Sequence, residues 1–305
     1  MTIAQRPAWV DDELFPFESR FLDIDGHTVH YVDEGSGPTL LLLHGNPTWS
    51  FFWRDVISAL RDDFRCVAVD YPGFGLSTAK PGYRYLPEEH ADVVTRFVDA
   101  LGLVGVTLVG QDWGGLIGLA VVQRRPSVFD RLVLANTWAW PVNGDFHFEW
   151  YSRIVGGPAG RFLTRRLNFL VNALIPVGHR RRKPTAAEMT HYRRALDTPG
   201  RRQASAVLPG QITACRAFFA EVEVGLADLA HLPTLIVWGD AQIGFRPQER
   251  ERLEAAFPEH KTVIVEGAGD FVVTDALEEF VAAISDWHTR APAGEARRSG
   301  KRTEA

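Results

Sequence analysis

A glycine-framed turn between a strand pattern and a helix pattern constrains this chain most strongly. Gly110-Gln111-Asp112-Trp113-Gly114 lies between an apolar run at residues 106–109 and a helical apolar pattern at 116–122. This succession is typical of a nucleophile elbow, in which a strained turn exposes one side chain above the end of a sheet. The residue at the apex is Asp112, and a carboxylate there can attack carbon to give an alkyl ester that water must later cleave. The alternative is that Asp112 only caps the helix.

A second motif upstream fits the same site. His44-Gly45-Asn46-Pro47-Thr48-Trp49 directly follows a strand-like run at residues 39–43. In an elbow of this kind, the loop after that strand and the residue after the nucleophile each supply one backbone N–H of an oxyanion hole. Asn46 and Trp113 occupy these positions, and both side chains carry neutral N–H donors. Such donors suit a departing halide, whose charge develops only as its bond breaks. We expect His44 to be structural.

The order of elements predicts an α/β fold. Residues 21–25 and 28–33 form a hairpin pattern around Gly26. Strand-like runs then recur at 40–43, 66–69, 107–109, 132–134, 234–237 and 262–265, and helical patterns include 51–60, 88–101 and 276–287. Alternating βα units predict a mainly parallel, eight-stranded sheet with helices on both faces. The alternation breaks between about Trp140 and Ile212, which indicates an inserted helical cap.

On these motifs the chain resembles the haloalkane dehalogenases of the α/β-hydrolase superfamily. The resemblance covers about residues 15–287, and its most specific pieces are HGNPTWSFFWRD (44–55), VDYPGFGLS (69–77), GQDWGG (110–115) and NTWAWP (136–141). It implies an Asp112 nucleophile and a halide site of Asn46 and Trp113. The Asn and Trp pair, together with Asn136, resembles the subfamily whose catalytic acid follows the seventh strand.

Two positions depart from the family pattern. The family acid is expected at Gln242, within Trp238-Gly239-Asp240-Ala241-Gln242, and the family histidine base at Asp270, within Gly267-Ala268-Gly269-Asp270-Phe271. Gln242 cannot carry charge, but its amide could donate a hydrogen bond to Asp270. Asp112 and Asp270 would share one dry pocket, so one pKa should rise. Because the ordinary pKa of Asp lies about 2.6 below that of His, a base at Asp270 should be roughly tenfold slower or worse.

Three functions follow from this reasoning. The first is a haloalkane dehalogenase with a compromised base, and the second is a dehalogenase-like protein that binds or traps its ligand covalently without turnover. The third is an epoxide hydrolase, for which Tyr151 and Tyr192 of the cap would have to act as acids. The remaining histidines, including His147 in the cap, are expected to be surface or structural residues rather than a replacement base.

We expect the core to span residues 1–139 and 213–290, the cap 140–212, and a disordered tail 291–305. The cap should set substrate choice, because small-molecule pockets are mostly apolar and aromatic. The predicted pocket residues are Trp138, Trp140, Phe148 and Phe271, with further roof candidates at Phe146, Trp150, Phe162, Phe169 and Leu170.

Composition limits the partners. The chain has 305 residues, 46% of them hydrophobic, which is enough for one large core and a subdomain. A net charge of −5 argues against nucleic acid or an anionic membrane as a partner. No run is long enough to span a membrane, and the first twenty residues are too acidic for a signal peptide, so we expect a cytoplasmic protein. The predicted partners are a small apolar halogenated substrate, halide and water, with no metal or cofactor. The two cysteines predict no disulfide framework.

Overall fold

A computed structural model describes residues 5–290, so the tail expected to be disordered lies outside the described residues. Eight strands form one sheet in the order β1-β2-β4-β3-β5-β6-β7-β8. From β4 to β8 all neighbouring strands are parallel, and only the β1–β2 and β2–β4 pairs are antiparallel. The prediction of a mainly parallel, eight-stranded sheet is therefore confirmed. The strands are β1 (Arg20–Ile24), β2 (His27–Glu34), β3 (Thr39–Leu43), β4 (Arg65–Val69), β5 (Val106–Gln111), β6 (Phe129–Ala135), β7 (Thr234–Gly239) and β8 (His260–Val265).

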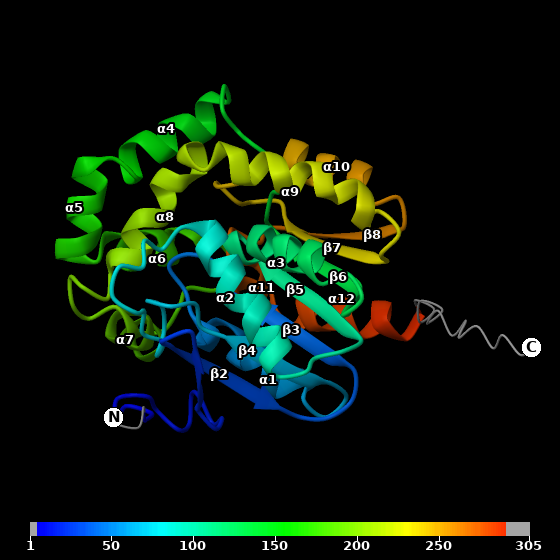
Figure 1. Ribbon diagram of the computed structural model, residues 1–305, viewed down its shortest axis with the longest axis horizontal. Helices are drawn as coiled ribbons and strands as arrows, with labels where there is room; N and C mark the ends of the chain where they lie inside the picture. The colour runs from blue at the N-terminus through cyan, green and yellow to red at the C-terminus, as the bar shows by residue number, and fades with distance from the viewer. Residues whose placement is uncertain (1–4, 291–305) are drawn as a thin grey trace, which may run out of the picture.

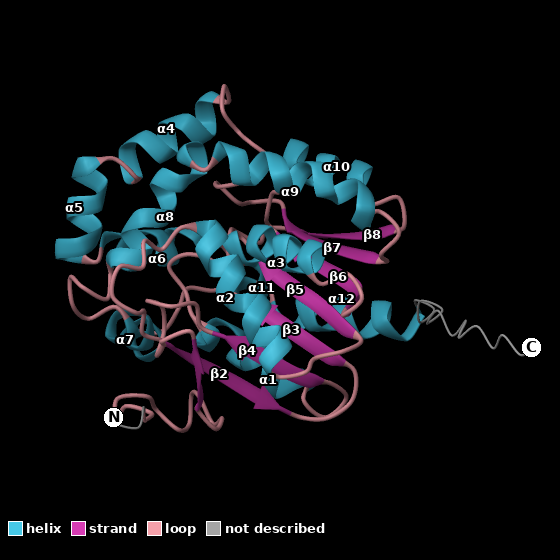
Figure 2. Ribbon diagram, in the orientation of Figure 1, coloured by secondary structure: helices cyan, strands magenta, loops and turns pink. Residues whose placement is uncertain are grey.

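Helices cover both faces of the sheet (Figure 2). The central strands are apolar on both sides, and successive side chains enter opposite layers: Leu41 and Leu43 join one core, while Leu40 and Leu42 join the other. Helices α2, α3, α9 and α10 contribute to the first core, and η1, α1, α11 and α12 to the second. These elements are η1 (Ser50–Trp53), α1 (Arg54–Leu60), α2 (Pro87–Ala100), α3 (Trp113–Arg124), α9 (Arg216–Leu229), α10 (Pro247–Ala256), α11 (Val272–Asp275) and α12 (Leu277–Arg290).

A group of helices between β6 and β7 gathers at one end of the sheet (Figure 1). They are α4 (Phe146–Val155), α5 (Pro158–Leu167), η2 (Leu170–Leu174), α6 (Ile175–Gly178), α7 (Ala186–Ala195) and α8 (Gln203–Ala214). The buried Glu188 of α7 pairs with Arg54 of α1 and so ties this group to the core. The helical insertion agrees with the expected cap, while its limits at 140 and 212 stay a prediction.

Candidate active site

Asp112 occupies a strained turn between β5 and α3. Its φ of 54° and ψ of −125° lie in a region that non-glycine residues rarely adopt. The flanking glycines allow the close approach that the turn needs. A Cβ at Gly110 would lie 2.6 Å from the carbonyl oxygen of Gly114, and one at Gly114 would lie 2.0 Å from that of Leu43. The turn therefore presents the Asp112 carboxylate at the carboxyl ends of the strands, where a parallel sheet places its ligand sites.

Two backbone N–H groups point at this carboxylate. The Asn46 N–H donates to Oδ1 of Asp112 at 3.0 Å, and the Trp113 N–H also donates to the Asp112 carboxylate. Burial raises the pKa of Asp112 to about 7; the two N–H bonds oppose this shift, and the charge of Asp270 adds to it. The expected rise is confirmed for Asp112, although burial rather than Asp270 is its main cause.

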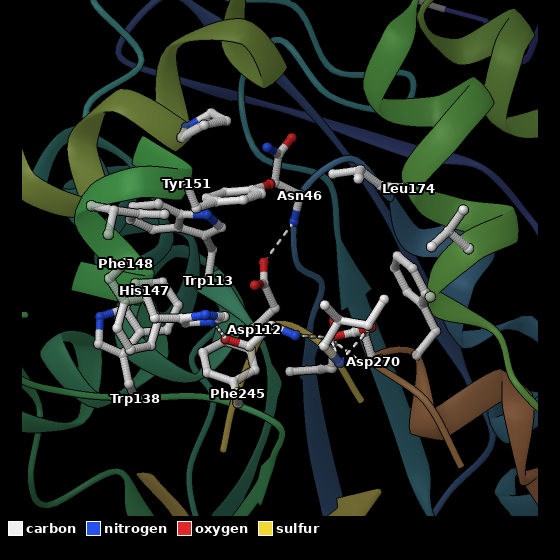
Figure 3. Close-up of a pocket in the computed structure, with 18 residues that line it drawn as sticks. Asn46, Asp112, Trp113, Trp138, His147, Phe148, Tyr151, Leu174, Phe245 and Asp270 are labelled. Atoms are coloured by element: carbon white, nitrogen blue, oxygen red, sulfur yellow. Dashed lines mark hydrogen bonds between the residues drawn. The ribbon is translucent and has the colours of Figure 1, made fainter. Parts of the chain in front are cut away.

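A cavity of about 180 Å³ opens above Asp112 (Figure 3). Trp138, Phe148 and Phe271 line it as predicted, and so does Tyr151, which the sequence offered only as an acid for epoxide opening. The lining residues that the sequence did not indicate are Gln111, His147, Leu174, Val177, Gly178, Pro209, Ile212, Ile243, Gly244 and Phe245. The wall is thus mostly apolar, with a few polar groups around the nucleophile.

The placement of Trp140 in this pocket needs correction. Trp140 instead borders a separate hollow on the outside of the core, where the Arg252 guanidinium lies 4.4 Å from its ring centroid. Only Ala139 separates it from Trp138, but the two tryptophans border different cavities.

Helical phase explains two of the other misplaced roof residues. Phe146 and Trp150 lie four residues apart on the outer face of α4 and are 77% and 57% exposed. Phe148 and Tyr151, three residues apart, face the cavity. The 3.6-residue period of α4 could have separated these two faces in the sequence. Phe162 is also exposed, and neither Phe169 nor Leu170 lines the cavity.

Asp270 lines the same cavity from the turn between β8 and α11, but its carboxylate is held by the loop after β7. Oδ1 accepts hydrogen bonds from the N–H groups of Gly244 at 2.6 Å and Ile243 at 3.2 Å. Burial raises the pKa of Asp270, and these two N–H groups oppose that shift. Asn136 joins the two loops, because its amide donates to the Asp270 carbonyl at 3.1 Å and accepts from the Gly239 N–H at 3.1 Å.

Gln242 does not support Asp270 in the expected way. Its Nε2 donates to the carbonyl oxygen of Gly239 at 2.8 Å, and Gln242 does not line the cavity. The expected amide hydrogen bond to Asp270 is therefore wrong, because backbone N–H groups of the next two residues have taken that place.

Asn46 and Trp113 both reach the cavity. Nδ2 of Asn46 donates to the Ser205 carbonyl of α8 at 3.2 Å. A primary amide has two N–H groups, so one stays available for a ligand. Figure 3 shows the Asn46 amide and the Trp113 indole on the same side of the Asp112 carboxylate.

The histidines divide into structural ones and one that lines the cavity. His44 is fully buried, donates from Nδ1 to the Gly45 carbonyl at 2.9 Å, and has its pKa lowered to about 4 by burial. It is thus a neutral structural residue, as expected. His147, which was expected to be a surface or structural residue of the cap, lines the cavity. Among residues 5–290, no cluster of His, Cys, Asp or Glu could hold a metal ion.

The comparisons with known proteins agree with this geometry. A family model described as the alpha/beta hydrolase fold matches residues 38–277. "Haloalkane dehalogenase 2" of Mycobacterium tuberculosis is 45% identical over 276 residues, which cover 90% of this chain and 96% of that protein. The chain belongs to the haloalkane dehalogenases of the α/β-hydrolase superfamily. It is accordingly a hydrolase of the haloalkane dehalogenase type.

Two further likenesses are more distant. A cis-3-alkyl-4-alkyloxetan-2-one decarboxylase of Shewanella oneidensis is 30% identical over 298 residues, covering 91% of this chain and 90% of that protein. The crystal structure of haloalkane dehalogenase DbeA from Bradyrhizobium elkani superposes with a TM-score of 0.82 at 24% identity, covering 90% of this chain and 98% of DbeA. The second likeness shows the shared fold.

Proposed function

We propose that this protein cleaves carbon–halogen bonds through an alkyl ester on Asp112. The observation that carries the proposal is the Asp112 carboxylate at the floor of an apolar cavity, with the N–H groups of Asn46 and Trp113 aimed at it. An apolar wall favours a small halogenated alkane as substrate. Attack of an Asp112 oxygen on the halogenated carbon forms the ester and expels halide.

The departing halide would be held by the Trp113 indole N–H and the free amide N–H of Asn46. Both donors are neutral, so they stabilise the charge that develops on the halogen without pairing strongly with Asp112 before reaction. The backbone N–H groups of Asn46 and Trp113 would stabilise the hydrolysis step, because water attack on the ester places negative charge on an Asp112 oxygen.

Hydrolysis of the ester should be the slow step. The position of the family base is occupied by Asp270, whose carboxylate already accepts two backbone N–H bonds. Those bonds occupy lone pairs that would have to accept a proton from water, so Asp270 is poorly placed to act as a base although burial raises its pKa. We therefore propose slow turnover; permanent trapping of the alkyl group is the alternative that the experiment distinguishes.

The test is intact-protein mass spectrometry after incubation with 1-iodobutane, alongside measurement of iodide release. A butyl adduct should form, map to Asp112, and decay slowly as iodide continues to accumulate. Asp112→Ala should abolish the adduct, whereas the control Asp62→Ala, which alters an exposed carboxylate after α1, should not. An adduct that survives in Asp112→Ala would contradict the nucleophile assignment, and a stoichiometric adduct that never decays would show trapping.

The position of Tyr151 supports epoxide opening as a second candidate function. Its phenol borders the cavity, while Tyr192 is buried against Phe51 and does not reach it. A phenol beside the nucleophile can protonate an epoxide oxygen as Asp112 attacks the carbon. Incubation with 1,2-epoxybutane should then give an Asp112 adduct that Tyr151→Phe abolishes; no adduct would remove this candidate.

The location also stays a prediction. No helix in residues 5–290 is long and apolar enough to cross a membrane. We propose a cytoplasmic enzyme that binds neither nucleic acid nor membrane, and fractionation of the expressing cells would test the location.

A further inference from the structure

One imidazole faces the cavity among the residues that the structure describes, and it belongs to His147 at the start of α4. The side chain is half-buried. Figure 3 shows His147 beside Phe148 and Phe245, to one side of Asp112. An imidazole at this place borders the space in which water must approach an ester on Asp112.

A hydrogen bond defines the tautomer of His147. Nε2 lies 3.1 Å from the carbonyl oxygen of Gly244, and a carbonyl can only accept, so Nε2 carries the proton. The neutral ring then has its lone pair on Nδ1. No hydrogen-bond partner of Nδ1 lies among residues 5–290. The ring therefore has one nitrogen that anchors it and one that is free to accept a proton.

The backbone around His147 fixes where the ring stands. Asp145 caps α4 by accepting from the His147 N–H at 3.0 Å, and Arg246 pairs with Asp145. Gly244, which accepts from the ring, also donates its N–H to Asp270. The loop after β7 thus positions the imidazole and occupies the Asp270 carboxylate at the same time.

We propose that His147, rather than Asp270, is the general base that hydrolyses the alkyl ester. This inference rests on the proposed alkylation of Asp112. Nδ1 takes a proton from water as the water oxygen bonds to the ester carbon of Asp112. The intermediate then expels the alkoxide, which takes the proton from the imidazolium and leaves as alcohol. Asp112 is released as a carboxyl group and loses its proton to solvent, so the sum is haloalkane and water to alcohol, halide and one proton.

The charged and titratable groups around the ring come from four elements. Asp145 and Tyr151 belong to α4 and its cap, Arg246 to the start of α10, and Asp112 and Asp270 to the turns after β5 and β8. Formation of the ester neutralises Asp112, whereas Asp145 stays paired with Arg246. The pH dependence of ester decay therefore reports the ring in a nearly constant charge environment.

The experiment follows the butyl adduct by intact mass after unreacted 1-iodobutane has been removed. His147→Gln keeps an N–H that can donate to the Gly244 carbonyl but has no basic nitrogen. Adduct decay should slow about 100-fold, within the range that a general base contributes. The rate of adduct formation should change less than about threefold. His231→Gln, at an exposed histidine before β7, is the matched control and should leave both rates unchanged.

The pH profile of adduct decay distinguishes a general base from a residue that only supports the structure. Decay in the parent should become slower as the pH is lowered, because a protonated ring cannot accept a proton. This slowing should be absent in His147→Gln. If that variant folds poorly by circular dichroism, added imidazole should restore decay in His147→Ala.

The outcomes distinguish failure of the His147 role from failure of the proposed function. An adduct that forms on Asp112 and decays equally fast in the parent and in His147→Gln overturns the role of His147 alone. The same holds if the parent adduct persists, or if Asp270→Asn abolishes decay while His147→Gln does not. If no adduct forms on Asp112 in the parent, the proposed function fails and this inference fails with it.

Discussion

Replacing Asp112 by Asn should stabilise the protein at neutral pH by an amount set by the buried charge. The ordinary pKa of 3.8 rises to about 7 in the folded chain, chiefly through burial. At about 1.4 kcal/mol for each pH unit, this difference gives a ceiling of about 4 kcal/mol. The neutral amide oxygen accepts the N–H groups of Asn46 and Trp113 more weakly than the carboxylate does, which costs about 1 kcal/mol. We therefore expect a net gain of about 3 kcal/mol above pH 8.

The sign of the pH dependence follows from proton binding. Below pH 3.8 the carboxyl is protonated in both the folded and the unfolded chain, so its ionisation has no effect on stability. Between 3.8 and about 7 the folded chain holds more protons than the unfolded chain, and the free energy of unfolding falls as pH rises. The advantage of Asp112→Asn should therefore be absent near pH 3.5 and fully present above pH 8.

The assay is urea unfolding of the parent, Asp112→Asn and the exposed-site control Asp62→Asn at a series of pH values. The free-energy difference between Asp112→Asn and the parent should grow by about 4 kcal/mol between the acid and alkaline limits, while the control should show little change. A difference that is the same at both limits would refute the reasoning, because it would mean that Asp112 titrates near its ordinary pKa. A parent that unfolds in acid narrows the range to pH 5–8, where about 2 to 3 kcal/mol should still appear.

Three further predictions concern catalysis. Adduct formation should be about 100-fold slower at pH 5 than at pH 9, because only about 1% of Asp112 is ionised two units below its pKa of about 7; a flat single-turnover profile would contradict this. Chloride or bromide should quench tryptophan fluorescence, and Trp113→Phe should remove much of that quenching and slow alkylation; unchanged values would exclude the halide role. Asp270→His combined with Gln242→Asp should raise steady-state halide release at least about tenfold, since a carboxylate can orient the new imidazole. A rate equal to that of the parent would show that the existing base is already competent.

The sequence alone was sufficient for the sheet and for the floor of the site. Apolar runs at the expected spacing predicted the parallel strands, and the glycines around Asp112 predicted the elbow. Parallel strands end at the same edge, so the loop carrying Asn46 and the turn carrying Asp112 had to meet once β3 and β5 paired. These features depend on local pattern and on strand direction, which the order of residues already contains.

Only the tertiary structure decided which side chains enclose the cavity above that floor. The rotation of α4 turned Tyr151 and His147 inward and Trp150 outward, and this rotation depends on packing of the cap against the core. The sequence also failed to predict the partner of Asp270. Backbone N–H groups of the loop after β7, rather than the Gln242 amide, donate to its carboxylate. A residue's neighbours along the chain define its possible partners, but contacts between distant segments choose among them, and those contacts exist only once the chain has folded.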